Sequence, residues 1–413
     1  LMTVTAPADI DTAFSDFMPT FGLNMRQFDM MMKIYKILSQ KYDVVCTNPP
    51  YMGGSGMNAK LSEFVKSKFP DYKSDLFSTF VIRCTQLCKA EGYLGFLTPY
   101  VWMFIQSYEK MRNYIYSTRT IETLIQFEYS AFEEATVPIC TFALKNSKVN
   151  KKGVYLRLTD FRGGMEVQRQ KTLEAIADHK CGYYFETNSA NFSKIPGSPV
   201  AYWVSENFIR AFERGISIDS ISDFTGSQHI TANNDKYLRL HWEIDANKVG
   251  MGKKWVYYAK GGDFRKWYGN IELVVDWSEG AVQYYKTNST SNLLAEKYRF
   301  KEGITYTELT SSVNTFRYLP PVCIFDKKGP SIVSVKKLWY CLGIFGTKIA
   351  PLYFAILNPT LSTQVRDVKN LPIIVNGEIE PKIDEIVKEN VEICKQDWND
   401  FETSWGFEKH PLI

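Results

Sequence analysis

Apolar residues recur at helical spacing near both ends of the chain. Residues 24–40 carry them three or four positions apart, which predicts an amphipathic helix. A short β-type run, Tyr42 to Cys46, follows directly. Residues 381–398 repeat the helical pattern, with a stripe formed by Ile383, Ile386, Val387, Val391 and Cys394. We expect this last helix to pack on a domain.

Helical and β-type segments alternate in the first part of the chain. The expected helices are 75–89 and 108–118, and the expected strands are 93–97, 121–127 and 137–144. Such alternation is typical of a mostly parallel, doubly wound sheet, so this part belongs to the α/β class.

A polar stretch that contains Lys148, Lys151 and Lys152 predicts a connection between domains near residue 150. Beyond it, short β-type runs rich in aromatic residues follow without a regular alternation of strand and helix, which favours an α+β domain. The expected parts are therefore an α/β domain over residues 1–150, an α+β domain over 151–378 and a helical segment over 379–413.

The composition of the 413 residues is that of a globular protein, with 45% apolar and 23% charged residues. No apolar run reaches the roughly 18 to 20 residues that span a bilayer, and no signal peptide is recognisable, so we expect a cytoplasmic protein without a membrane partner. Its eight cysteines show no CxxC or zinc spacing, so no metal is expected. The net charge of +4 permits a nucleic-acid partner without requiring one.

The segment from Val44 to Tyr51, VVCTNPPY, is the strongest local signal. We interpret its first half as a buried strand. Because prolines cannot continue a ladder, the chain leaves the sheet at Asn48. The carboxyl ends of strands in open α/β sheets are where ligands bind, so the turn after this strand is a candidate site.

The turn presents an amide, a carbonyl and an aromatic ring. An exocyclic amine is a poor nucleophile because its lone pair is delocalised, and two acceptors aimed at its N–H groups favour a pyramidal nitrogen. The side-chain oxygen of Asn48 and the carbonyl of Pro49 are the expected acceptors, and the prolines Pro49 and Pro50 fix their direction. Stacking on Tyr51 would hold a base in line with an electrophilic carbon.

The motif resembles the Asn/Asp-Pro-Pro-Tyr signature of the amino-methyltransferases. Later segments resemble those that follow this signature in γ-type adenine-N6 DNA methyltransferases: Asp75-Leu76-Phe77, Glu91 to Pro99, and Phe132 with Val137 to Thr141. The resemblance implies the C-terminal part of a Rossmann-like methyltransferase sheet. It also implies that Phe132 stacks on the flipped adenine opposite Tyr51, the alternative being a packed core aromatic.

The resemblance implies S-adenosyl-L-methionine as methyl donor and double-stranded DNA as substrate. The adenine must be flipped out, and direct in-line transfer requires neither a covalent intermediate nor a metal. In the γ arrangement the donor-binding loop precedes the signature, but no such loop is recognisable in the 47 residues before Asn48. We therefore expect a portion of a larger enzyme, inactive or weakly active alone. Asp75 is either a helix N-cap or a contact to donor or substrate.

The second half resembles the DNA target-recognition region of type IIG restriction-modification methyltransferases and of PglX methyltransferases from the BREX phage-defence system. The matching segments are 225–226 with 234–239, 260–268, 311–317 and 397–405. The cations expected to contact DNA phosphates are Lys260, Arg265, Lys266, Arg317 and Lys327. Solvated turns are the alternative. The resemblance also leaves room for other defence-system subunits as partners.

Two other functions use parts of the same pattern. Protein glutamine N5-methyltransferases share the NPPY chemistry but generally need no long recognition domain after it. A DNA-recognition module without activity is the second alternative, because the donor loop is not recognisable. A nuclease is excluded within this chain, since Asp71-Tyr72-Lys73 and Asp326-Lys327-Lys328 are only fragments of a metal-binding pattern.

Overall fold

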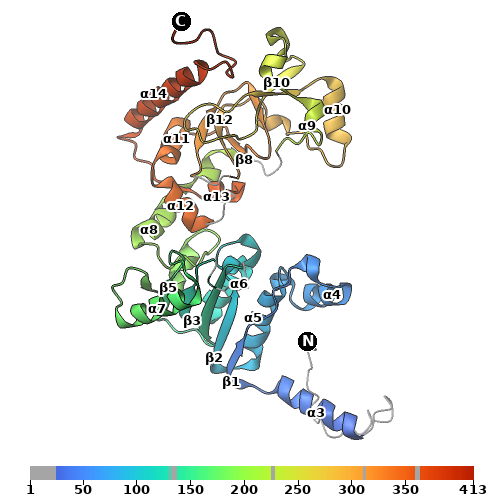
Figure 1. The fold of residues 1–413 in the computed structure, drawn as a ribbon, viewed down its shortest axis with the longest axis vertical. Helices are drawn as coiled ribbons and strands as arrows, with labels where there is room; N and C mark the ends of the chain where they lie inside the picture. The colour runs from blue at the N-terminus through green and yellow to red at the C-terminus, as the bar shows by residue number, and fades with distance from the viewer. Residues whose placement is uncertain (1–24, 130, 132–136, 225–227, 310–312, 359–362) are drawn as a thin grey trace. The chain divides into compact units, whose positions relative to one another are not determined.

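The computed structural model describes residues 25–129, 131, 137–224, 228–309, 313–358 and 363–413. Contacts within the chain divide it into two compact units (Figure 1). The first comprises Leu1–Ser193 with Gly197–Trp203, and the second comprises Lys194–Pro196 with Val204–Ile413. Each unit is described by itself.

The first unit is built on a six-stranded sheet. In spatial order its strands are β1 (Tyr42–Thr47), β2 (Cys88–Pro99), β4 (Ile139–Lys145), β3 (Thr120–Gln126), β5 (Gly153–Arg157) and β6 (Tyr184–Thr187). The pairs β1/β2 and β3/β5 are parallel, whereas β2/β4, β3/β4 and β5/β6 are antiparallel. The α/β class is confirmed, but the sheet is mixed.

The expectation of a mostly parallel sheet is wrong because of the connection before β4. Only 12 residues (127–138) separate β3 from β4, and β4 returns to pair antiparallel with both β3 and β2. By contrast, 40 residues (48–87) join β1 to its parallel neighbour β2, which leaves room for a crossover through helices.

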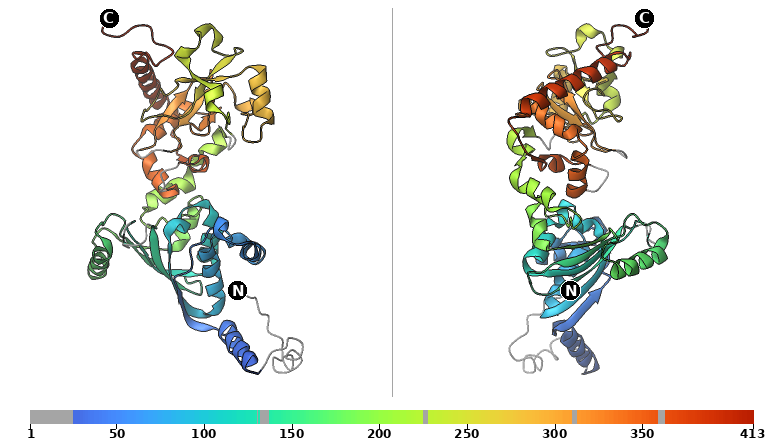
Figure 2. Two further views of the ribbon diagram at one scale, coloured as in Figure 1. Left: turned by 45° about the vertical axis from the view of Figure 1, so that its right-hand side comes forward. Right: turned by 90° about the vertical axis from the view of Figure 1, so that its left-hand side faces the viewer.

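Five helices accompany this sheet among the described residues: α3 (Met25–Ser39), α4 (Ala59–Lys68), α5 (Leu76–Leu87), α6 (Glu109–Thr118) and α7 (Gly164–Ala177). Helix α5 buries its apolar face beneath β1 and β2, where Phe77 and Val81 join Leu94 and Phe96 in the core. Helix α3 lies beyond the edge strand β1 and has no buried side chain among those described (Figures 1 and 2).

The division between the units differs from the expected boundary near residue 150. Strand β5 begins at Gly153 and pairs with β3, and β6 pairs with β5, so both extend the first sheet. Their backbone hydrogen bonds keep residues 153–187 within the first unit. The polar stretch before β5 is therefore a loop within the first unit that joins β4 to β5, which lie on either side of β3. The chain enters the second unit only around residues 194–204.

The second unit has the expected α+β composition. Its described strands form two four-stranded sheets and one short pair. The first sheet has the order β14 (Cys323–Phe325), β10 (Trp255–Ala259), β11 (Leu273–Asp276) and β9 (Leu238–Leu240), and the second has the order β13 (Phe316–Leu319), β12 (Gly303–Tyr306), β15 (Ser331–Val333) and β8 (Asp223–Phe224). The short pair consists of β16 (Pro372–Ile373) and β7 (Ile216–Ser217). Its helices are α8 (Glu206–Arg214), α9 (Asn234–Tyr237), α10 (Glu279–Thr287), α11 (Leu338–Gly346), α12 (Ala350–Leu357), α13 (Val365–Lys369) and α14 (Glu380–Asn399).

Helix α14 packs on α11, as expected for the last helix, and buries Val387, Val391 and Trp398 in the core of the second unit. It is thus part of that unit and not a separate segment. Within the described residues, no single helix is long and apolar enough to cross a membrane; α11 and α12 pass that test only as a pair, bent by 80°.

Candidate active site

The NPPY turn lies directly at the carboxyl end of β1, as the sequence predicts. Strand β1 ends at Thr47, which pairs with Phe96 of the parallel strand β2. The side chain of Asn48 is exposed, whereas Pro49 is buried. The expectation of a buried strand is wrong: β1 is the edge of the sheet in the described chain, and Val44 is 59% exposed.

The Tyr51 hydroxyl ties the two ends of the turn together. It lies 2.9 Å from the side-chain oxygen of Asn48 and 3.2 Å from the carbonyl oxygen of Leu97 in β2, and it donates a hydrogen bond to these acceptors. The bond to Asn48 orients the amide, and the contact with Leu97 fixes the tyrosine against the neighbouring strand. The side-chain amide therefore has a defined direction before any substrate is bound.

The ring of Tyr51 packs edge to face against Phe77. Its edge contact with Phe77 has a centroid distance of 6.4 Å and an interplanar angle of 87°, and Phe77 in turn packs against Tyr108. Partial burial raises the pKa of Tyr51, so its hydroxyl remains protonated and able to donate at neutral pH. The side chain keeps 38% of its surface exposed, which leaves area for a stacked base.

Asp75 caps helix α5, which confirms the N-cap interpretation. Its Oδ1 accepts a hydrogen bond from the backbone N–H of Phe77 at 3.1 Å. The same oxygen also accepts from the backbone N–H of Met52 at 2.9 Å, directly after the turn. The cap therefore links α5 to the residue that follows Tyr51.

Phe132, the second expected stacking residue, lies outside the described residues. The carbonyl of Pro138, just before β4, accepts a hydrogen bond from the N–H of Tyr100, just after β2. This bond joins the start of β4 to the end of β2, the strand next to β1.

The five cations expected to contact DNA fall into three groups. Lys327 is exposed, Lys260 is half-buried, and neither forms an ion pair with another described residue. The Arg265 guanidinium lies 3.4 Å from the Asp397 carboxylate and stacks over the ring of Trp398. The Lys266 ammonium donates a hydrogen bond to the Gly346 carbonyl. Residues 225–226 and 311–312, which belong to the segments matched to DNA recognition, lie outside the described residues.

Arg317 is buried, and the structure does not support its expected contact with DNA. Its side chain is 1% exposed and donates to the hydroxyls of Thr307 and Thr315 and to the carbonyl of Arg265. Burial lowers the pKa of Arg317 to about 10. The periodicity of a short strand does not distinguish an inward arginine from an outward one when both faces of the strand are buried.

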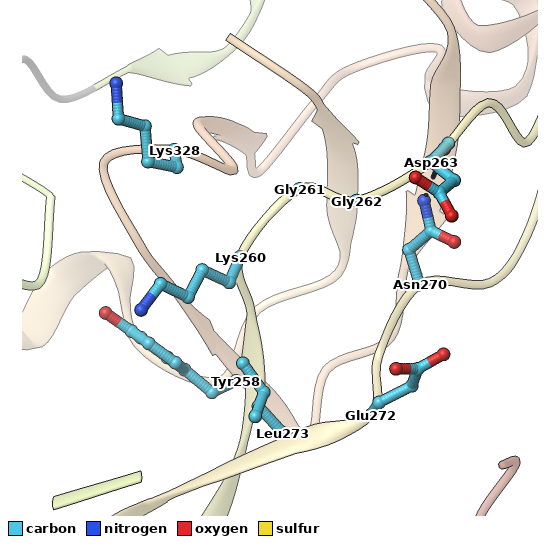
Figure 3. A pocket seen from close by; sticks show the side chains of 9 residues that line it. All are labelled: Tyr258, Lys260, Gly261, Gly262, Asp263, Asn270, Glu272, Leu273 and Lys328. Atoms are coloured by element: carbon cyan, nitrogen blue, oxygen red, sulfur yellow. Dashed lines mark hydrogen bonds between the residues drawn. The ribbon is translucent and has the colours of Figure 1, made fainter. Parts of the chain in front are cut away.

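Lys260 lines a pocket of about 400 Å³ in the second unit (Figure 3). Its wall consists of Tyr258, Lys260, Gly261, Gly262, Asp263, Asn270, Glu272, Leu273 and Lys328. Figure 3 shows the two lysines on one side and the two acidic residues with Asn270 on the other. Lys328 is also 3.2 Å from Glu308.

The glycines let the two lysine-bearing loops approach each other. Gly261 has a φ of +84°, and a Cβ at Gly329 would lie only 2.4 Å from the Gly261 nitrogen.

Sequence reasoning missed several residues that contribute groups to the NPPY turn and to the pocket of the second unit. Met52 and Leu97 contribute only backbone groups at the turn, so their side chains carry no signal. Phe77 stood in a recognised motif but without a role. Asn270 and Glu272 reach the pocket through the fold of the second unit, and nothing in their sequence neighbourhood indicates it.

Comparisons with known proteins find that the chain is similar to methyltransferases. The family model described as Eco57I restriction-modification methylase matches residues 9–132. The chain is 33% identical over 391 residues to the adenine-specific methyltransferase BrxX of Escherichia coli O9:H4 (strain HS). This match covers 91% of the chain and 31% of BrxX. It is 31% identical over 406 residues to the adenine-specific methyltransferase PglX of Lacticaseibacillus casei (strain Zhang). This match covers 93% of the chain and 33% of PglX.

The chain therefore spans about one third of the length of these relatives. Its fold is similar to that of the type IIL restriction-modification enzyme MmeI, solved in complex with DNA, with a TM-score of 0.55 over 86% of this chain and 49% of MmeI. The sequence identity is 11%, so this likeness shows the fold alone. The resemblance expected from the sequence is confirmed: over about nine tenths of its length the chain is similar to the adenine-specific methyltransferases BrxX and PglX, and its first part matches the Eco57I methylase family.

Proposed function

We propose that the chain supplies the catalytic turn and the DNA-recognition region of an adenine-N6 DNA methyltransferase. In this reaction the N6 nitrogen of a flipped adenine in double-stranded DNA would take the methyl group as the methyl C–S bond of S-adenosylmethionine breaks, with release of S-adenosylhomocysteine and of one N6 proton. The methylated base would mark host DNA in restriction-modification or phage defence. One observation carries the proposal: the Asn48 amide, at the carboxyl end of β1, is oriented by the Tyr51 hydroxyl at 2.9 Å. The adenine-specific relatives support it.

Asn48 and Pro49 act as acceptors for the target amine. An amide oxygen has two lone pairs, so Oδ1 of Asn48 can accept from Tyr51 and from the adenine N6–H at the same time. The Pro49 carbonyl takes the second N–H, and the adenine ring stacks on Tyr51. With both N–H groups held, the nitrogen lone pair points away from the ring plane toward the methyl carbon.

The methyl donor requires more than the described residues provide. S-adenosylmethionine supplies an electrophilic methyl group when bound. Beside the turn, β1 is an exposed edge, and α3 exposes Met30, Ile34 and Ile37 to between 50% and 57%. These exposed apolar residues do not by themselves form a site that fits the donor.

DNA contacts are assigned to the second unit. Lys260 and Lys327 carry charges that no described residue neutralises, and phosphates are suitable partners for them. Lys328 lines the same pocket as Lys260. We no longer assign such a contact to Arg317, because its side chain is buried.

Calorimetric titration of S-adenosylmethionine tests this proposal. The chain is titrated beside the full-length natural protein, and methylation of adenine-containing duplex DNA is measured for both. We expect the full-length protein to bind the donor and to methylate this DNA, and Asn48→Ala to lower the rate of transfer by about 100- to 1,000-fold. A rate that is unchanged in Asn48→Ala would disprove the role of the turn.

The exposed edge of β1 also favours a second candidate for the isolated chain, which is DNA recognition without transfer. Retained binding of duplex DNA together with weak donor binding would identify the isolated chain as such a module.

A further inference from the structure

Asp75 makes more contacts than a helix cap needs. A cap requires one acceptor for an N–H group of the first turn, and Oδ1 of Asp75 provides it for Phe77. The same oxygen binds the N–H of Met52, and the Met52 carbonyl accepts from the N–H of Leu76 at 3.0 Å. Gly53 and Asp75 also form an antiparallel bridge. The peptide groups after Tyr51 are thus held on both sides.

Asp75 also reaches Tyr51 by a second route. Its cap fixes the first turn of α5, which carries Phe77, and the ring of Phe77 meets the ring of Tyr51 edge to face. Tyr51 therefore lies between two groups that depend on Asp75. One is the Met52 N–H, which Asp75 binds, and the other is the Phe77 ring on the helix that Asp75 caps. A displacement of either contact moves the ring on which the base stacks.

We propose that Asp75 is a positioning residue for methyl transfer, which clamps the NPPY turn to α5 through Met52 and Phe77. This inference rests on the proposed function of the turn. The role belongs to the acceptor oxygen Oδ1, which acts through the backbone N–H groups of Met52 and Phe77. A misplacement of about 1 Å at a reacting centre lowers a rate by roughly 100-fold, so loss of the clamp acts on kcat.

Three variants separate the clamp from the cap. Asp75→Ser keeps an N-cap on α5, because serine caps helices about as well as aspartate. The serine hydroxyl lies one bond nearer the backbone than Oδ1, so we expect it to lose the bond to Met52. Asp75→Asn keeps an oxygen in place of Oδ1. The matched control is Asn58→Ala, which removes a cap of the same kind: the Asn58 side chain accepts from Leu61 at 2.9 Å and caps α4 only.

Two measurements are made on each variant: kcat and KM for methylation by the full-length natural protein, and hydrogen exchange of the Met52 amide. We expect Asp75→Ser to lower kcat about 10- to 100-fold with little change in the KM for DNA, and to accelerate Met52 exchange. Asp75→Asn should restore both. Asn58→Ala should lower thermal stability without either effect.

The outcomes separate this inference from the proposed function. Unchanged Met52 exchange in Asp75→Ser overturns the clamp even in an active enzyme. An Asp75→Asn variant that loses as much activity as Asp75→Ser shows that the charge matters and not the acceptor, which also overturns it. Absence of DNA methylation by the parent protein overturns the proposed function, whereas accelerated Met52 exchange in Asp75→Ser still establishes the clamp.

Discussion

The turn in the first unit and the pocket in the second hold their polar groups in opposite ways. At the turn, Tyr51 is fixed by Asn48 and Leu97, and Asp75 holds the next peptide group. At the pocket, Lys260 has no ionic partner among the described residues. The polar groups of the turn are held by hydrogen bonds before substrate arrives, whereas the pocket carries a lysine charge without an ionic partner among the described residues.

This difference matches what each place has to do. Aligning a nitrogen with a methyl carbon depends on fractions of an ångström, so the acceptors must be fixed in advance. Attraction of a phosphate depends on charge over a Debye length of about 8 to 10 Å, so a flexible lysine is sufficient. Substitutions at the turn should therefore change the rate, and substitutions at the pocket should change affinity and its dependence on salt.

The largest effect is expected for Asn48→Ala. Loss of one preorganised hydrogen-bonding group at a reacting centre typically lowers kcat by about 100- to 1,000-fold. DNA affinity should remain unchanged, because no phosphate contact is removed. Single-turnover methyl transfer and a DNA-binding isotherm measure the two quantities, with the exposed Asn113→Ala on α6 as control. A loss of affinity with an unchanged rate would reverse the comparison.

Arg317→Ala tests whether all cations of the second unit behave alike. Because the buried guanidinium donates to Thr307, Thr315 and a carbonyl, its removal leaves a cavity and unpaired acceptors. We expect the free energy of unfolding to fall by about 3 kcal/mol, measured in urea. The salt dependence of DNA binding should stay unchanged below the melting temperature. If the variant kept the full free energy of unfolding but showed a smaller slope of log K against log salt for DNA binding, Arg317 would be a phosphate-contacting residue after all.

The core next to the pocket should make stability dependent on pH. Burial lowers the pKa of His229 from 6.5 to about 3, and Tyr258, which lines the pocket, donates to the His229 carbonyl. Below pH 6.5 the unfolded chain binds a proton that the folded chain does not, so stability is lost as the pH falls from 6.5 toward 3. From pH 7.5 to 5 the loss is about 2 kcal/mol.

His229→Phe should remove this pH dependence, and His179→Gln, at an exposed ring, should leave it in place. Urea unfolding at the two pH values provides the measurement. If the free energy of unfolding of His229→Phe still fell between pH 7.5 and pH 5 by the same amount, another titrating group would be responsible.

The smallest effect is expected for Lys260→Ala. Loss of one phosphate contact should weaken DNA binding several-fold for all sequences and lower the slope of log K against log salt by about 1. Lys286→Ala, an exposed lysine on α10, is the control. Changed sequence preference with an unchanged salt slope would indicate that Lys260 reads a base edge.

Local features of the fold could be predicted from the sequence. The helix before the motif, the strand that stops at the prolines and the last helix lie within about three residues of their expected bounds, because periodicity and proline act over short distances. The cap at Asp75 was also visible as one of two alternatives. Its second hydrogen bond, to the peptide group after Tyr51, was not.

Contacts between distant residues could not be predicted. The bond from Met52 to Asp75 joins positions 23 apart, and the contact of Arg265 with Asp397 joins positions 132 apart. Neither leaves a local pattern. Exposure of β1 was missed for the same reason: an apolar strand is expected to be buried, and only the strand order shows it at an edge.

The open edge of β1 also affects how the chain behaves in solution. An edge strand presents unpaired N–H and carbonyl groups, which can pair with the edge of another molecule. Val44 and the apolar residues of α3 add uncovered surface beside it. A preparation of the isolated chain should therefore self-associate more at higher concentration, and a charged residue at position 44 should keep it monodisperse without touching the turn.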